Sequence, residues 1–176
     1  MNQALAAFPN RHDGEKLIDS LFLFAEANYY YFDERDLRVR IQQLYDRPSL
    51  ENVDDLDFVA LALVSFALGS QFTQFNGILL QVAEISAEGR LPGARFMYHA
   101  ERIMPLVMTR CSIESLQCCL LMAICLLPTA GPKASYIYLS LALKIAISLG
   151  LHRSTGSSPA DKTLQRVFWT TYVIER

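Results

Sequence analysis

Residues 142–176 read ALKIAISLGLHRSTGSSPADKTLQRVFWTTYVIER, and the rest of the chain is best interpreted outward from this stretch. A helical pattern ends on Leu-Gly-Leu-His-Arg at 149–153 and is followed by a polar loop and a second helical pattern. Gly150 suits the left-handed conformation that closes many helices, because glycine has no Cβ. Ser158, the proline after it and Asp161 supply the cap, the first-turn proline and the third-position acid of a new helix. The stretch therefore predicts a helical hairpin.

The hairpin also contains large and charged side chains whose roles can be anticipated. Leu151 can fold back on the preceding helix, Trp169 is expected to bury a large area between helices, and Arg166 is expected to cap carbonyls or pair with an acid. We prefer a structural role over ligand contact for the candidate residues of this stretch, which are Leu149, Gly150, Leu151, His152, Arg153, Arg166, Trp169 and Arg176.

Apolar residues recur at helical spacing along most of the remaining chain. We expect a loose lead-in over 1–14 and one domain over 15–176. The helices we expect before the final one cover 15–31, 33–48, 55–72, 77–88, 94–108, 112–127 and 132–149. Because no strand or hairpin signal is present, the sequence predicts an all-α fold, with antiparallel helical hairpins stacked into an irregular and incomplete array.

Several local features of these helices can be predicted. Asp33 and Ser112 are suited to cap helices, and Asp54 with Asp57 resembles a capping arrangement, which we prefer over a metal site because helix dipoles attract acids. Pro105 is expected to kink or end its helix. We interpret Arg35, Arg38 and Arg40 as a solvated face. Since helix 132–149 carries only a narrow polar stripe, we expect it near the centre of the stack.

The composition limits the classes of partner. The chain is 52% hydrophobic and 19% charged, with a formal net charge of -2, so it lacks the basic balance typical of a duplex binder. The longest apolar stretches, 58–68 and 116–127, are shorter than the ~20 residues that a spanning helix needs. We therefore expect buried core helices and no membrane partner.

We find no catalytic or metal-binding motif in the sequence. Cys111, Cys118, Cys119 and Cys125 lack paired metal-ligand spacing, and we interpret them as thiols of a reducing compartment. The chain contains no nucleophile elbow, phosphate-binding glycine loop or zinc-protease helix. His12, His99 and His152 are far apart in sequence. We expect the protein not to be an enzyme and to hold no cofactor in this chain.

The second half of the chain resembles the regulatory (middle homology) domain of fungal zinc-binuclear-cluster transcription factors, which includes the xylanolytic transcriptional activator regulatory domain. The segment 112–117 is similar to the family's serine-rich start before Leu-Gln and a long apolar helix, and 138–146 to its tyrosine-leucine stretch before the Leu-Gly-Leu-His-Arg turn. Residues 165–169 resemble its R-R-x-W-W signature, and 172–176 its tyrosine-x-x-aspartate-arginine ending. Gln165, Phe168 and Glu175 depart from these patterns.

The resemblance implies a regulatory and interaction domain involved in DNA-templated transcription, located in the nucleus. It also implies that DNA is contacted only through a zinc cluster, which this chain lacks because no run of six closely spaced cysteines precedes the domain. Zinc is thus expected only in that missing cluster, and the chain is expected to be a fragment of a longer regulator. Expected partners are proteins of the transcription machinery, a second copy, or a small-molecule effector.

Two alternatives to a transcription role stay open at this stage. The phenylalanine- and methionine-rich interior is compatible with a helical module that senses a small metabolite, or with a protein-interaction scaffold. An enzyme of unknown type would need polar groups to converge around His99 or His152.

Overall fold

Two apolar helices form the centre of the molecule. They are α4 (Leu56–Thr73) and α6 (Ile113–Leu126). The computed structural model describes residues 2–25, 29–46, 56–73, 92–128, 132–153 and 158–176. These ranges contain helices and no strand, so the predicted all-α class is confirmed.

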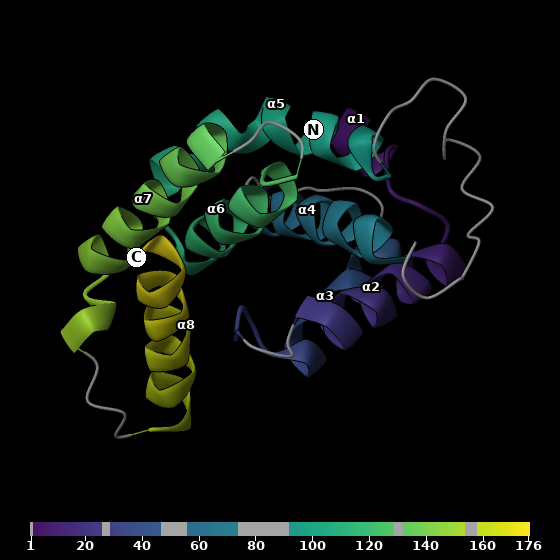
Figure 1. The fold of residues 1–176 in the computed structure, drawn as a ribbon. Coiled ribbons are helices and arrows are strands. Elements are labelled where there is room, and N and C mark those ends of the chain that lie inside the picture. Colours follow the sequence, from purple (N-terminus) through teal and green to yellow (C-terminus); the bar gives the residue numbers. More distant parts are fainter. Residues whose placement is uncertain (1, 26–28, 47–55, 74–91, 129–131, 154–157) are drawn as a thin grey trace.

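Helix α4 is enclosed by its neighbours along almost its whole length. It packs against α2 (Arg11–Ala25), α5 (Ala94–Arg110) and α6, and Figure 1 shows it between α2 and α5. It is long and apolar enough to cross a membrane, but 89% of it is buried among the other helices, as expected for a core helix. Gly69 permits the close approach of α2, because a Cβ at this position would overlap with the backbone of Leu17.

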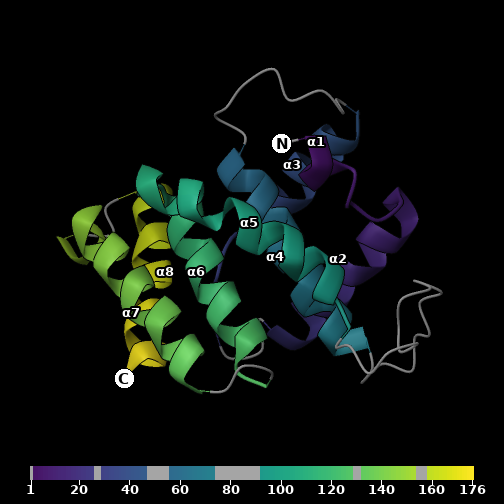
Figure 2. The same ribbon diagram turned by 90° about the horizontal axis from the view of Figure 1, so that it is seen from above.

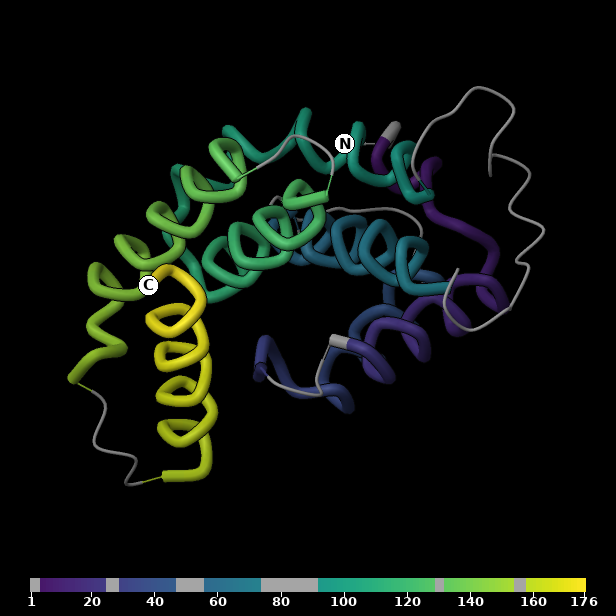
Figure 3. The backbone as a smooth tube through the Cα atoms, in the orientation of Figure 1, coloured from purple at the N-terminus to yellow at the C-terminus, as the bar shows by residue number. Residues whose placement is uncertain are grey.

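The C-terminal half adds a second layer of helices to this centre. Helix α6 packs extensively on α7 (Pro132–Ser148), and the short helix η3 (Leu151–Arg153) leads into α8 (Pro159–Glu175). Figure 2 shows α7 beside α6, and Figure 3 follows the backbone into α8, which returns along α7. Stacked hairpins were predicted, and α6–α7 and α7–α8 are such pairs.

The N-terminal segment packs on the domain instead of forming a loose lead-in. Helix α1 (Asn2–Leu5) contacts α5, and Ala4 and Ala7 are buried. The ring of Phe8 meets the ring of Phe66 edge to face, with centroids 5.3 Å apart. The expectation of a loose segment came from Pro9, Asn10 and Gly14, but their local breaking of the pattern did not reveal the apolar contacts on either side.

Several predicted helix boundaries need correction. The helix expected over 15–31 begins at Arg11 and ends at Ala25, and the aromatic segment Tyr29–Phe32 is not helical. Helix α5 continues through Pro105 to Arg110. Helix α3 (Glu34–Asp46) begins after the predicted cap, since the Asp33 side chain accepts the Asp36 N–H at 3.0 Å. The expected helix 77–88, the capping role of Asp54 and the stop at Pro48 lie outside the described residues.

Candidate functional site

The turn of the C-terminal hairpin forms as the sequence predicts. Gly150 adopts a left-handed φ of 72°, and Leu151 turns back and is buried. Helix α8 begins with a capping box, in which the Ser158 side chain accepts the Asp161 N–H at 3.0 Å and Asp161 accepts the Ser158 N–H at 3.1 Å. These features fix the direction of α8 relative to α7.

The aromatic segment Tyr29–Phe32 packs against α8 through Arg166 and Thr170. Thr170 Oγ1 accepts the Tyr30 N–H at 3.1 Å, and the Arg166 guanidinium lies 3.8 Å from the centroid of the Tyr30 ring. On the other side of the segment, Gln117 of α6 donates to the Tyr31 carbonyl at 2.8 Å. The prediction that Arg166 caps carbonyls or pairs with an acid is corrected by this ring contact, which a sequence separation of more than a hundred residues concealed.

Trp169 is not the buried wedge that we expected. Its side chain is 53% exposed, because the buried face of α8 is formed by Val167, Thr170 and Thr171 instead. The indole meets the Tyr172 ring edge to face with centroids 5.8 Å apart, and Arg176 lies 4.9 Å from the centroid of the same ring. This end of the molecule therefore presents the Trp169 ring to solvent, beside the half-buried rings of Phe168 and Tyr172.

The remaining signature residues line the turn between the two helices. His152 and Arg153 are exposed, and Arg153 Nε donates to His152 Nε2 at 3.1 Å. The His152 ring lies 6.4 Å from the Phe168 ring, while Leu149 is partly exposed at the end of the hairpin arm. The structure thus brings His152 close to Phe168 of α8.

Helix α7 lies at the edge of the stack, not near its centre as we expected. Only Ser135, Ala142, Ile145 and Ala146 are buried, and they form one narrow face. Tyr136, Ile137 and Ile147 are 59%, 65% and 51% exposed. The narrow polar stripe of α7 predicted a place near the centre of the stack, but in the described residues its outward side is open.

Charge is distributed unevenly between this hairpin and the rest of the chain. Residues 132–176 contain six Lys and Arg against two acids, a formal net charge of +4, whereas residues 1–131 contain ten against sixteen, a net charge of -6. The exposed apolar residues of α7 and α8 therefore lie in a basic surrounding. The net charge of the whole chain, -2, had concealed this division.

A polar junction that sequence reasoning did not find joins α4, α5 and α6. The Asp57 carboxylate is buried, accepts the Ser112 hydroxyl at 2.7 Å and lies 3.4 Å from Arg110. Asp57 lies in the first turn of α4 and also joins this helix to α5 and α6. Ser112 is the predicted cap of α6 and forms a capping box with Ser115. The clue available in the sequence was that Arg110 and Ser112 flank a helix boundary.

Arg40 also departs from the predicted solvated face. Its guanidinium lies 3.9 Å from the centroid of the Phe58 ring and 2.9 Å from Glu114 of α6. Arg38 forms ion pairs with Asp19 and Glu34 at 2.8 and 2.7 Å. These two arginines therefore fasten α3 to its neighbours.

The cysteines and histidines form no reactive cluster in the described part of the chain. Cys118, Cys119 and Cys125 are buried, and burial raises the pKa of all three thiols, that of Cys119 to about 12. Burial and the nearby Arg95 and Arg102 lower the pKa of His99. Among the described residues there is no group of three His, Cys, Asp or Glu that could hold a metal ion.

The fold and its exposed hairpin define an all-α domain with an outward basic and aromatic face. Comparison with known proteins identifies its family: the chain belongs to the fungal specific transcription factor domain family, whose model matches residues 23–176. It is a regulatory domain of a transcription regulator, in agreement with the resemblance seen in its C-terminal half.

Three relatives illustrate the family. The chain is 31% identical to an uncharacterized transcriptional regulatory protein of Schizosaccharomyces pombe, of which it covers 22% and which covers 100% of the chain. It is 26% identical to the thiamine repressible genes regulatory protein thi1 of the same yeast, covering 22% of it with 98% of the chain. It is 27% identical to the related protein thi5, covering 19% of it with 91% of the chain. The chain thus spans about a fifth of the length of these relatives, and no solved structure matches it.

Proposed function

We propose that the domain regulates transcription in the nucleus by contacting other proteins through the exposed faces of α7 and α8. The observation that carries this proposal is the exposure of large apolar side chains on α7 and of Trp169 and Val173 on α8, in a chain that belongs to the fungal specific transcription factor domain family. Large apolar side chains that stand exposed in number on neighbouring helices are typical of interaction sites. The domain catalyses no reaction in this proposal.

The experiment is a reporter assay in a fungal host, with residues 1–176 fused to an unrelated DNA-binding domain. We expect the fusion to change reporter output relative to the DNA-binding domain alone. Replacing Ile137 and Trp169 with alanine should reduce that change, whereas the matched replacement of exposed Val39 on α3 should not. Unchanged output at equal protein levels would count against a regulatory role.

DNA contact and zinc belong, in this proposal, to a region of the regulator outside these 176 residues. The support is the acidic net charge of the chain and the absence of a metal-ligand cluster among its described residues. The purified chain should bind neither a duplex nor zinc in a stoichiometric amount. Fluorescence microscopy of the tagged full-length regulator tests the nuclear location, and exclusion from the nucleus under every growth condition would refute it.

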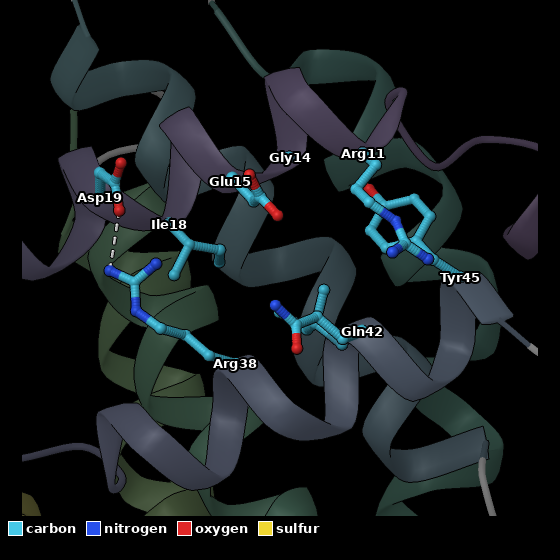
Figure 4. Close-up of a pocket in the computed structure, with 9 residues that line it drawn as sticks. Arg11, Gly14, Glu15, Ile18, Asp19, Arg38, Gln42 and Tyr45 are labelled. Carbon is cyan, nitrogen blue, oxygen red and sulfur yellow. Dashed lines mark ion pairs between the residues drawn. The ribbon is translucent and has the colours of Figure 1, made fainter.

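A second candidate function, sensing of a small molecule, has one observation in its favour. A cavity of about 150 Å³ lies between α2 and α3, where Arg11, Glu15, Gln42 and Tyr45 converge (Figure 4). The cavity is smaller than most ligand sites, which occupy ~300–1,000 Å³, and Arg11 is already paired with Asp46. Protein contact is therefore the preferred function.

Thermal shift measurements with a metabolite panel test this second candidate. Thiamine belongs in the panel because two relatives are named for thiamine-repressible genes. A ligand of the cavity should raise the Tm of the chain, and Gln42→Ala should abolish the rise. A flat response from the folded chain would remove the candidate.

A further inference from the structure

One side of α8, together with the C-cap residue that follows it, carries an exposed stripe of five residues. We call it the α8 stripe, and its members are Lys162, Arg166, Trp169, Val173 and Arg176. The opposite side of the helix, formed by Val167, Thr170 and Thr171, is buried. The stripe is therefore on the exposed side of a helix whose other side packs against α7 and η3.

The spacing of the α8 stripe is that of a helix–helix seam. Its members follow one another at intervals of four, three, four and three residues, which places the first four in one row along the α-helix and Arg176 at the C-cap that continues this row. Trp169 and Val173 lie inside the row and are 53% and 55% exposed, so each can bury more area against a partner. The row thus has an apolar middle and cationic ends.

The charges at the ends select the type of partner. In an antiparallel pairing of two copies about Trp169, Lys162 of each copy would lie opposite Arg176 of the other, and this like-charge contact disfavours self-association. A helix with carboxylates at those positions would instead gain two opposite-charge contacts. The hairpin's net charge of +4 adds a longer-range attraction for an acidic segment.

Two of the cations are held in place before any partner arrives. Arg166 lies over the Tyr30 ring at 3.8 Å and Arg176 over the Tyr172 ring at 4.9 Å. Ring contacts of this kind leave the edge of a guanidinium free to donate to a carboxylate. The aliphatic Val173 between them suits an apolar side chain better than a nucleic-acid base, which favours a protein segment over a nucleic acid.

We propose that the α8 stripe docks an acidic amphipathic helix, with apolar side chains against Trp169 and Val173 and carboxylates against Lys162 and Arg176. The proposal deepens the interaction function proposed above and rests on it. It names the chemistry of one partner and the side of α8 to which that partner binds.

Trp169 provides a direct readout, because it is the only tryptophan of the chain. The probe is a synthetic helical peptide without tryptophan that carries a leucine seam flanked by glutamates, titrated into the folded chain of 176 residues. Docking should shift the indole emission to shorter wavelength, as water is displaced from the ring. A peptide of the same seam with lysines in place of glutamates is the matched control and should bind at least about tenfold more weakly.

Variants locate the binding to one helix side. Lys162→Glu and Arg176→Glu should each lower the affinity for the acidic peptide by about tenfold or more. Lys144→Glu reverses an exposed charge on α7 and should lower this affinity by less than about threefold. Circular dichroism shows that each variant is folded. Increasing the salt concentration should weaken binding of the acidic peptide.

Three results would overturn the proposal. The first is a Trp169 emission that does not shift at a millimolar concentration of the acidic peptide. The second is an equal loss of affinity for this peptide in Lys144→Glu and Lys162→Glu. The third is tighter binding of a duplex or single-stranded oligonucleotide than of the peptide. If the reporter assay responds to the domain while the peptide fails to bind, only the choice of partner is wrong. If the reporter assay fails as well, the proposed function falls with it.

Discussion

The junction at Asp57 allows the sharpest test of how the central helices are held together. Asp57→Ala removes the carboxylate that accepts the Ser112 hydroxyl at 2.7 Å and lies 3.4 Å from Arg110. The bond between a buried carboxylate and a hydroxyl contributes about 1.5–3 kcal/mol. The Arg110 side chain is 28% exposed, so its ion pair is partly screened and adds at most about 1 kcal/mol. We expect the free energy of unfolding to fall by about 1.5–4 kcal/mol.

Urea unfolding followed by circular dichroism measures this change in the free energy of unfolding. The double-mutant cycle of Asp57→Ala with Ser112→Ala should show a coupling energy of at least about 1 kcal/mol, because each variant removes the same hydrogen bond. Ser65→Ala is the matched control. Ser65 is buried, and its hydroxyl has no hydrogen-bond partner within the described residues, so its loss should cost little.

Two outcomes would refute the reasoning about Asp57. A loss below about 0.5 kcal/mol for Asp57→Ala would mean that water replaces its contacts at no cost. Strict additivity with Ser112→Ala would mean that the two side chains do not interact in solution.

Three further predictions concern other parts of the chain. Gly69→Ala should lower the free energy of unfolding by about 1–3 kcal/mol, measured as a lower urea midpoint, because a Cβ would push α2 away from α4. Thr170→Val should cost about 1–3 kcal/mol in the same assay, because it leaves the Tyr30 N–H without its acceptor; an unchanged midpoint would show that this N–H finds water. Burial raises the pKa of Cys119 to about 12, so it and the other two buried thiols stay protonated at pH 8, and only Cys111 should react quickly with a thiol reagent until denaturant is added. Reaction of all four thiols in the native protein would contradict this burial.

Local signals in the sequence predicted the helix boundaries better than the helix environments. Ser112, Gly150 and Ser158 were predicted correctly because capping and left-handed turns depend on residues within one turn of the helix. The sequence did not predict the open side of α7 or the exposure of Trp169. The reason is that composition indicates how apolar a helix is but not which of its sides has a neighbour.

The sequence predicts which segment forms the candidate site, but it does not predict the contacts that the side chains of this segment make. Arg166 finds its partner in Tyr30, and Asp57 finds Ser112, over separations that no periodic pattern spans. Both contacts depend on how separate helices pack, which one sequence taken by itself does not specify. The charge pattern indicates the basic hairpin only when the net charge of residues 132–176 is counted separately from that of residues 1–131.

The seating of Tyr29–Phe32 against α8 also affects how the protein is made. Tyr30 and Thr170 are separated by 140 residues, so their hydrogen bond cannot form until residue 170 has left the ribosome. Protein synthesis adds about 5–20 residues per second, so about 7–28 s pass between the synthesis of Tyr30 and that of Thr170. During that interval the nascent chain exposes the side of the Tyr30 ring that Arg166 covers in the finished fold, and chaperones have a defined window in which to bind it.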